Sequence, residues 1–498
     1  MRRKYFLLFL SIILFLSLSL GPGLQADDGK RLNCFTVLVG KKASADGSVL
    51  VAHNEDDTGD IILNIRKIAP RHYDQVIKVN LGHGATWETA GQTSGFLWIE
   101  ASAQEFADSF VNEHGVVITS DACASRETNE DYTDGGISYL LRRIVAEKAR
   151  TAREAVQLAG ELIEKYGYRS SGRTYSIADK NEAWMLTVIR GRHWLAQRVP
   201  DDQVAVIPNY YTIRQVRLDD PENFLGSPDL IDYARENGWY NPEKDGPFDF
   251  KKAFSRPSRR DPVFDGNSLR MWRGVAILSG KDWKVEDDFP FSFRPDRKIT
   301  PEILMSLLRD HYEGTEYDAT DGYKNGSPNL TKFRTICTSS TINSFVAVLN
   351  AQKPEPLSVL LWLAPGKPDT TIYLPIYYGI SRMPEGLGAG PDQHDYELLY
   401  RQHFQPEELI AARDRLLHTR ILRLERVVEG NYGQMIEVVK KELRPLEKEY
   451  LSRQKSFESK FSQLQARNPV AAGQALDKFV TEAFERLEKV YKKLEAKY

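Results

Sequence analysis

Short apolar runs separated by polar turns occupy the chain from residue 34 to about residue 207. Residues 34–39 and 48–52 flank a polar turn that contains Asp46 and Gly47, a composition typical of a β-hairpin. Residues 106–111 and 116–120 flank a second turn, and residues 175–178 and 183–188 flank a third. The pattern predicts antiparallel strands joined in hairpins.

Residues 137–166 have a different pattern, in which apolar side chains recur every three or four positions. Leu140, Ile144 and Val145 share one face at this spacing, as expected of a helix that packs on a core. A helical pattern returns at residues 301–311, whereas residues 210–295 are rich in Pro, Gly, Asp and aromatic residues and predict long ordered connections. Hairpins combined with separate helices favour an α+β fold over a βαβ repeat.

The remainder of the chain predicts further strands followed by helices. Residues 345–349, 358–363 and 371–374 are apolar runs of strand length. From Pro406 onward Glu, Lys, Arg, Leu and Ala dominate and Gly is rare, which indicates helices. We expect a body over residues 34–400 and a helical extension over residues 401–498 that packs on it, which we favour over a separate coiled-coil module.

Residues 1–26 have the pattern of a secretory leader. Arg2, Arg3 and Lys4 precede an apolar stretch over residues 5–20, and we expect cleavage after Ala26; an uncleaved membrane anchor is the alternative. Cleavage there leaves residues 27–33 as a short propeptide. The sequence therefore predicts an exported protein, periplasmic or extracellular, with no stable membrane span after processing.

Charge and composition exclude some classes of partner. The chain of 498 residues has 67 Lys and Arg against 69 Asp and Glu, and a formal net charge of −2. This balance gives no polyanion-binding surface, so nucleic acid is not an expected partner. With 41% hydrophobic residues the chain can bury a sizeable core. Nothing in the composition fixes the oligomeric state, and a homo-oligomer is left open.

The cysteines and histidines do not form a recognisable metal or disulfide framework. The chain has only three cysteines, Cys34, Cys123 and Cys337, which are few for an exported protein that is stabilised by disulfides. We expect Cys123 and Cys337 in the core, and a disulfide between them is left open. The nine histidines are scattered and neither His-Glu-x-x-His nor Cys-x-x-Cys occurs. We therefore expect no metal and no cofactor.

Cys34 is the candidate nucleophile. It opens the first strand of the first hairpin, and the antiparallel return brings the end of the second strand beside it. His53, Asn54 and Asp56 are therefore expected near the Cys34 sulfur. If the bond before Cys34 is cut, the new α-amine, with an ordinary pKa of about 7.7–8.0, can take the proton of a thiol whose pKa is about 8.5. A buried structural cysteine is the alternative.

The stretch from Asn33 to Gly40 and its continuation through residues 46–48 and 52–57 resemble the dipeptidase family of cysteine N-terminal nucleophile hydrolases, which is related to the secernins. The resemblance continues in order through residues 107–116, 120–123, 151–155, 272–274, 308–315 and 368–375. It implies a four-layer αββα sandwich, with two antiparallel sheets between helix layers. It also implies hydrolysis of dipeptides or short peptides through a thioester after cleavage between Asn33 and Cys34; whether that cleavage is autocatalytic is left open.

The resemblance also implies roles for individual residues. By similarity to the wider cysteine branch, which includes bile salt hydrolases and penicillin acylases, Cys34 matches the nucleophile and Asp56 the acid that holds its amine. Asn209 resembles the asparagine that donates to the oxyanion. A second arginine near the thiol is either Arg270 or Arg273, which the sequence does not separate. His53 stands where acylases of that branch have arginine.

Dipeptide selectivity also requires an acid that meets the free ammonium of the substrate. The candidates by predicted strand ends are Glu55, Asp57, Glu113 and Asp121. Two alternatives to a dipeptidase remain. One is an acylase of the same superfamily that acts on non-peptide N-acyl amides, and the other is a non-catalytic secreted binding protein that uses the helical tail.

Overall fold

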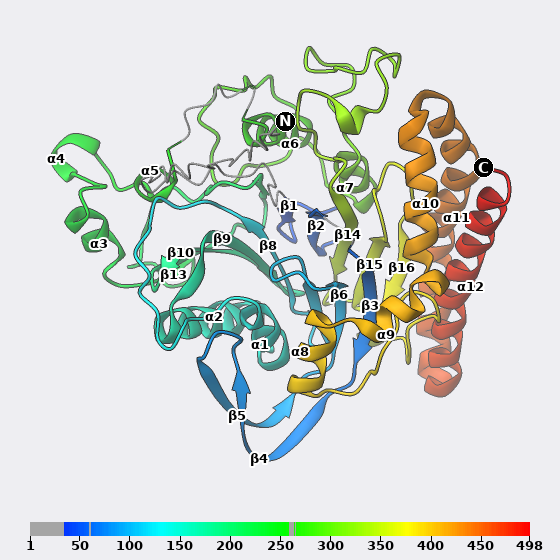
Figure 1. Ribbon diagram of the computed structural model, residues 1–498, viewed down its shortest axis with the longest axis horizontal. Helices are drawn as coiled ribbons and strands as arrows, with labels where there is room; N and C mark the ends of the chain where they lie inside the picture. Colours follow the sequence, from blue (N-terminus) through cyan, green and yellow to red (C-terminus); the bar gives the residue numbers. More distant parts are fainter. Residues whose placement is uncertain (1–33, 59–60, 258–262, 264) are drawn as a thin grey trace, which may run out of the picture. The chain divides into compact units, whose positions relative to one another are not determined.

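Two antiparallel sheets lie at the centre of the computed structural model, which describes residues 34–498 except 59–60, 258–262 and 264 (Figure 1). The strands of the six-stranded sheet lie in the order β12-β1-β2-β14-β15-β16. Their bounds are β1 (Phe35–Val39), β2 (Val49–Asp56), β12 (Val204–Ile207), β14 (Thr341–Leu349), β15 (Val359–Ala364) and β16 (Leu374–Tyr377).

The eight-stranded sheet has the order β13-β11-β10-β9-β8-β7-β6-β3. Its strands are β3 (Leu63–Ile68), β6 (Phe96–Ala101), β7 (Ser109–Asn112), β8 (Val117–Ala122), β9 (Tyr168–Ala178), β10 (Ala183–Gly191), β11 (Trp194–Val199) and β13 (Phe224–Gly226). A separate two-stranded hairpin is formed by β4 (Arg71–Asn80) and β5 (Thr86–Thr93).

The three hairpins expected from the sequence are confirmed. Strand β1 pairs with β2, β7 with β8, and β9 with β10, all antiparallel. The first turn follows its local chemistry, because Gly47 takes a φ of 80° and the Asp46 carboxylate accepts a hydrogen bond from the Ser48 amide. Local turn residues and strand alternation therefore specify the hairpin that begins with Cys34.

Helices cover the outer face of each sheet. Helices α1 (Leu140–Lys148) and α2 (Ala152–Tyr166) contact the eight-stranded sheet, while α6 (Asn267–Ser279) and α7 (Pro301–Leu308) contact the six-stranded sheet. Along β10, Met185 belongs to the core that includes the six-stranded sheet, and its neighbours Trp184 and Leu186 belong to the core under α1 and α2. This alternation is expected of a strand buried on both faces. The four-layer αββα arrangement expected from the sequence is confirmed.

Residues 210–295 contain more regular structure than the sequence predicted. Besides the long connections they include α3 (Leu230–Glu236), α4 (Pro242–Asp245), α5 (Phe250–Phe254) and the 13-residue helix α6. Helix α6 begins after Gly266 without a side-chain cap, and it has Gly274 in its interior, where a Cβ would approach Phe35 and Val206 to 3.1 Å. A larger residue would have to push these two side chains aside, so the close packing on β1 and β12 favours glycine here, although glycine lowers helix propensity.

The last part of the chain is helical, as expected. It contains α8 (Tyr396–Phe404), α9 (Glu407–Ala412), α10 (Leu417–Gly430), α11 (Tyr432–Arg467) and α12 (Pro469–Glu495). Short 3₁₀ turns occur at Pro328–Leu330, Glu355–Leu357 and Arg413–Arg415. Residue 400, the expected boundary, falls inside α8, and strand β16 lies at Leu374–Tyr377 rather than at residues 371–374.

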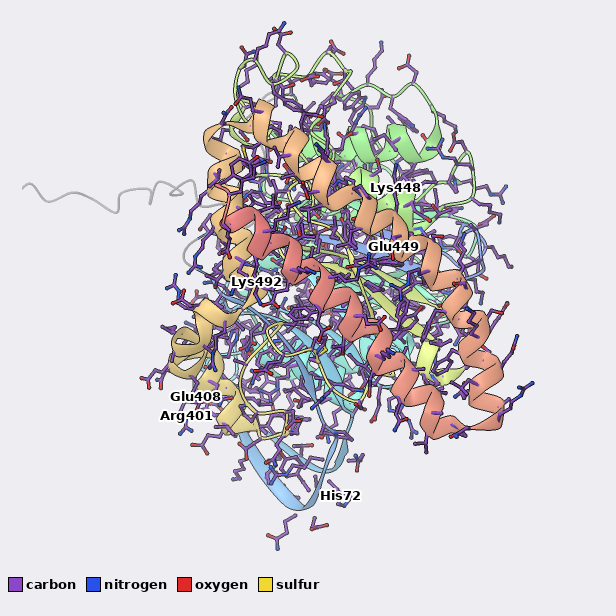
Figure 2. All side chains as sticks on the ribbon, turned by 90° about the vertical axis from the view of Figure 1, so that its right-hand side faces the viewer. His72, Arg401, Glu408, Lys448, Glu449 and Lys492 are labelled. Atoms are coloured by element: carbon purple, nitrogen blue, oxygen red, sulfur yellow. The ribbon has the colours of Figure 1, made fainter. Side chains whose placement is uncertain are left out.

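Helices α11 and α12 pack on each other and on β16. Figure 2 views this side of the molecule, with Lys448 and Lys492 exposed on the two helices. Leu443 of α11 and Tyr491 of α12 are buried. An ion pair between the buried Glu447 of α11 and the partly buried Arg309 joins the extension to the body. Within the described residues, none of the helices has the length and apolar character needed to cross a bilayer. The expected leader and propeptide lie outside the described residues.

Candidate active site

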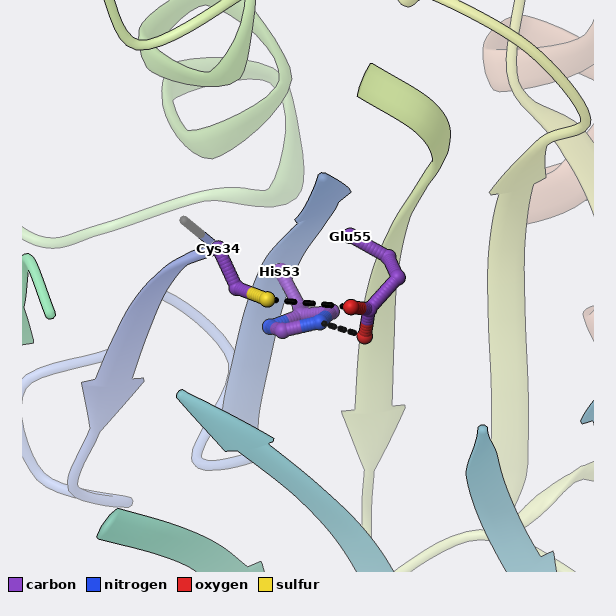
Figure 3. A group of neighbouring side chains, drawn as sticks. All are labelled: Cys34, His53 and Glu55. Carbon is purple, nitrogen blue, oxygen red and sulfur yellow. Dashed lines mark hydrogen bonds and ion pairs between the residues drawn. The ribbon is translucent and has the colours of Figure 1, made fainter. Parts of the chain in front are cut away.

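Cys34 immediately precedes β1, and its side chain faces the space between the two sheets (Figure 3). The register pairs Thr36 with His53 across the β1–β2 hairpin, so Glu55 lies opposite Cys34. Because alternate residues of a strand share a face, the side chains of Cys34, Thr36, His53 and Glu55 all project toward the eight-stranded sheet. The Cys34 side chain is buried there, with a residue exposure of 1%.

A continuous series of hydrogen bonds leads away from the sulfur. The Cys34 thiol donates to Glu55 Oε1 over 3.0 Å, and Glu55 Oε2 lies 3.0 Å from His53 Nε2 (Figure 3). The other ring nitrogen of His53, Nδ1, lies 2.7 Å from the hydroxyl oxygen of Thr36. The Thr36 hydroxyl is in turn 2.6 Å from Asp121 Oδ2 on β8. The thiol is thus linked to an acid on the second sheet.

Burial dominates the proton affinities of this cluster. It raises the pKa of the Cys34 thiol well above its usual value, and the nearby acids Glu55 and Asp121 raise that pKa further. Burial also raises the pKa of Glu55 to about 7 and that of Asp121 to about 7. The same cause lowers the pKa of His53 to about 4. Near neutral pH the thiol is therefore protonated, the imidazole is neutral, and the two carboxyl groups are close to titration.

Asn54 and Asp56 project from the opposite face of β2. The Asn54 amide donates to the carbonyl oxygens of Leu308 and Ile336. Asp56 accepts from Thr341 Oγ1 at 2.6 Å and from Arg334 Nη2 at 3.2 Å, and burial raises the pKa of its carboxyl group to about 6. Strand alternation turns both side chains toward the helix layer, so neither hydrogen-bonds the thiol, but the Asp56 carboxylate is still close enough to help raise the pKa of Cys34. The expected role of Asp56 toward the amine of Cys34 stays a prediction.

Arg270, not Arg273, lies at the nucleophile. Arg270 Nη1 donates to the carbonyl oxygen of Cys34 at 3.0 Å, and Nη2 donates to Asn209 Oδ1 at 2.8 Å. Arg273, one helical turn away, instead forms a two-pronged ion pair with Asp310. The structure thus separates two arginines that the sequence left equivalent.

Asn209 is held in a specific orientation beside this arginine. It follows β12 with a φ of 73°, a left-handed conformation that asparagine tolerates better than most residues. Its Oδ1 accepts from Arg270, and its Nδ2 is buried without a hydrogen-bond partner among the described residues. An unpaired buried N–H group near a nucleophile is suited to stabilise an oxyanion.

The four acids proposed to meet a substrate ammonium lie in different places. Glu55 and Asp121 belong to the thiol cluster, and Asp57 is buried just after β2. Glu113 lies in the β7–β8 turn, at the opposite end of β8 from Asp121, and its carboxylate accepts a hydrogen bond from the Gly95 amide. Geometry therefore separates Glu113 from the candidate site.

Three further residues at the cluster were not predicted. Thr36 could have been identified from the alternation of β1, which puts it on the face of Cys34. Arg142 of α1 and Arg173 of β9 are buried, and both donate to the hydroxyl of Ser120, beside Asp121. Arginines are most often exposed, and nothing in the sequence near these two marks them as buried.

Two groups of side chains have ligand-type atoms within 4.8 Å of one another: Cys34, His53 and Glu55, and a second group of His311, Cys337 and Asp369. The hydrogen bonds within the first group account for its short distances. In the second, His311 contacts Glu313 and Asn329, and Asp369 accepts from Tyr432 of α11. This second network joins the body to the extension. Cys123 and Cys337 are both free thiols in the structure.

The chain is similar in sequence to known peptidases. The sequence matches peptidase family C69 over residues 33–412, a segment that includes Cys34 and both sheets. A probable dipeptidase of Salmonella dublin is 28% identical over 378 residues, which cover 73% of this chain and 85% of that protein. Dipeptidase A of Lactobacillus helveticus is 29% identical over 392 residues, which cover 73% of this chain and 78% of that protein.

Among solved structures, penicillin V acylase of Agrobacterium tumefaciens is similar over 69% of this chain and 86% of its own, with 13% identity and a TM-score of 0.35. The family match covers most of the chain and contains every strand of the two sheets. The chain therefore belongs to peptidase family C69.

Proposed function

We propose that this chain is a cysteine-type dipeptidase that hydrolyses dipeptides or other short peptides through a thioester on Cys34. The observation that carries the proposal is the position of the Cys34 thiol, which is held among acid and base groups at the start of β1, next to the Arg270–Asn209 pair. The substrate class is supported by the relatives from Salmonella dublin and Lactobacillus helveticus, which are named as dipeptidases.

Activation requires cleavage of the peptide bond before Cys34. The environment of the thiol raises its pKa, so the sulfur needs a base before it can attack. A free α-amine on Cys34, with an ordinary pKa of about 7.7–8.0, is such a base and lies on the same residue as the sulfur. Asp56, with its neighbours Arg334 and Thr341, lies at the end of β2 next to this position and would hold the amine.

The reaction then follows from the positions of the groups. The thiol proton passes to the amine and the sulfur attacks the amide carbonyl. Negative charge develops on the carbonyl oxygen, and the unpaired Nδ2 of Asn209 is the donor proposed to receive it. Removing one such donor typically costs about 3–4 kcal/mol of transition-state stabilisation. The ammonium of Cys34 protonates the departing amine, and water then hydrolyses the thioester and regenerates the thiol.

Arg270 serves this scheme as a positioning residue. Its Nη2 fixes Asn209 Oδ1, which determines where the Nδ2 group points. Its Nη1 fixes the carbonyl of Cys34 and so the start of β1. We also propose that the protein is exported, on the basis of the leader-like pattern of residues 1–26.

A dipeptide panel tests the proposed function. Purified wild-type protein should hydrolyse several dipeptides, and Cys34→Ala should lose this activity while keeping the melting temperature of the wild type. Hydrolysis of N-acyl amides without hydrolysis of dipeptides would indicate an acylase instead. Full activity in Cys34→Ala would exclude the proposed nucleophile.

A further inference from the structure

The hydrogen-bonded series at the nucleophile contains more acid–base groups than the proposed reaction uses. The free amine of Cys34 suffices as the base for substrate hydrolysis, yet four other side chains lie in line behind the thiol. We name this set the relay: Cys34, Glu55, His53, Thr36 and Asp121. Its successive separations are 3.0, 3.0, 2.7 and 2.6 Å, all within hydrogen-bond distance.

We infer that the relay shares one proton between Glu55 and Asp121, and that Glu55 in its ionised form accepts the thiol proton of Cys34. This inference rests on the proposed function, because it concerns the activation of the same thiol. It adds a base that is present before Cys34 has a free amine. Such a base is what the first cleavage, before Cys34, would require if the chain cuts itself.

Counting hydrogens leaves two arrangements for the relay. In the first, Asp121 is ionised and accepts from the Thr36 hydroxyl, which therefore accepts from His53 Nδ1–H. A neutral imidazole with its proton on Nδ1 has a bare Nε2, so Glu55 must be protonated and donate to it. The thiol then faces a neutral carboxyl group and has no base.

In the second arrangement, the three links between Glu55 and Asp121 are reversed. Asp121 is protonated and donates to Thr36, whose hydroxyl donates to His53 Nδ1. The imidazole then has its proton on Nε2 and donates to Glu55, which is ionised. Glu55 Oε1 can now take the thiol proton: the S–H bond breaks, an O–H bond forms, and the electron pair stays on sulfur. The tautomer of His53 thus couples two acids on different sheets.

The charges that face the relay keep the two arrangements close in energy. Burial favours the neutral form of each acid and raises the pKa of both Glu55 and Asp121 to about 7, while nearby arginines oppose this. Each acid has one neighbour in the relay that can accept or donate its proton, His53 for Glu55 and Thr36 for Asp121, so the proton can reside at either end. The facing charged and titratable groups are Arg142 from α1, Arg173 from β9, Arg270 from α6, Asp56 and Asp57 from the end of β2, Asp108 before β7, and Cys123 after β8.

Thr36 offers the sharpest test, because its hydroxyl links His53 to Asp121 and has no hydrogen bond to the sulfur. Thr36→Val removes the hydroxyl and keeps the shape, whereas Thr36→Ser keeps the hydroxyl. The readout is the rate at which iodoacetamide alkylates Cys34 in the full chain between pH 5 and 10, followed by mass spectrometry of the peptide that contains Cys34. This measurement needs no dipeptide, so it is independent of the proposed function.

In the wild type the alkylation rate should rise near pH 7, where the shared proton is lost from the two acids. In Thr36→Val the imidazole has no acceptor at Nδ1, so its proton stays on Nε2 and donates to Glu55, which favours the ionised carboxylate. The rise should therefore move to lower pH and the rate near pH 6 should exceed that of the wild type several-fold, while Thr36→Ser keeps the wild-type profile. Asp121→Asn places an amide that donates to Thr36 as protonated Asp121 does, so it should also favour ionised Glu55 and move the rise to lower pH. This variant decides the question if Thr36→Val does not fold. Wild-type profiles in both variants would overturn the relay, even if the protein hydrolyses dipeptides.

Discussion

Arg270 Nη1 donates a 3.0 Å hydrogen bond to the carbonyl oxygen of Cys34, so a side chain of helix α6 binds the residue just before β1. The same guanidinium reaches Pro208 O and Asn209 Oδ1 with its other terminal nitrogen. A single side chain thereby fixes both the proposed nucleophile, just before β1, and the proposed oxyanion donor, just after the neighbouring strand β12.

The two terminal nitrogens of the Arg270 guanidinium should both be needed for efficient hydrolysis of dipeptides. Arg270→Lys keeps the charge but cannot reach both partners at once, because an ammonium lacks the planar fork. We expect kcat for a dipeptide to fall by about 100-fold with a smaller change in KM, a typical effect of misplaced catalytic groups. Arg273→Lys on the same helix is the matched control and should keep kcat within a few-fold, because Arg273 binds Asp310 instead. Equal losses in the two variants would contradict this role of Arg270.

Asn209 should contribute to catalysis through its side-chain amide nitrogen rather than through its backbone conformation. Asn209→Gly accepts the φ of 73° without strain and removes the donor, so the melting temperature should change little. We expect kcat to fall by about 100- to 1,000-fold, as for loss of one oxyanion donor. Steady-state kinetics on a dipeptide measures this effect. Wild-type kcat in Asn209→Gly would remove Asn209 from the mechanism.

The two acids of the relay should make stability depend on pH. Their folded-state pKa values of about 7 lie above the usual values for Glu and Asp, so the folded state binds protons more tightly than the unfolded state does. The stability they contribute is full below about pH 4 and is lost as the pH rises through about 7. Glu55→Gln mimics the protonated acid and should raise the free energy of unfolding at pH 8 by on the order of 1 kcal/mol.

Urea denaturation of the wild type and Glu55→Gln at pH 5 and pH 8 measures this difference. The gain should be present at pH 8 and absent at pH 5, where Glu55 is already protonated. A variant that is equally destabilised at both pH values would show that Glu55 is ionised throughout.

The helical extension should be an integral part of the fold. Glu447 is buried on α11, accepts two hydrogen bonds from Arg309, and accepts a third from the Tyr373 amide. Glu447→Ala leaves the partly buried Arg309 without its carboxylate partner and should destabilise the protein by about 2–3 kcal/mol in urea denaturation. Glu449→Ala, two residues away on a more exposed face, breaks a pair with Arg486 and should cost less than about 1 kcal/mol. Similar losses in both would argue against a structural tie at Glu447.

Much of the fold follows from local sequence. The hairpins could be predicted because turn residues such as Asp46 and Gly47 are adjacent to the strands that they connect. Helix α6 could not, because Gly274 weakens its propensity and the helix depends on packing against β1 and β12. Tertiary contact, rather than local preference, decides its structure.

The candidate site was predicted in part for similar reasons. Cys34 was identified as the nucleophile from its place in the chain and from family resemblance. His53 lies in the thiol cluster as expected, whereas the two-residue alternation of β2 puts Glu55, rather than Asn54 or Asp56, in hydrogen-bond contact with the sulfur. Asp121 and Arg173 lie on strands remote in sequence, and only the stacking of the two sheets brings them to the thiol.

The mass of the first tryptic peptide of active, dipeptide-hydrolysing protein tests the central claim most directly. A free α-amine can act as the base only if Cys34 is the first residue. The account predicts an N-terminal peptide that begins at Cys34. Full activity in protein whose first peptide begins at Asp27, or at any other residue before Cys34, would contradict it.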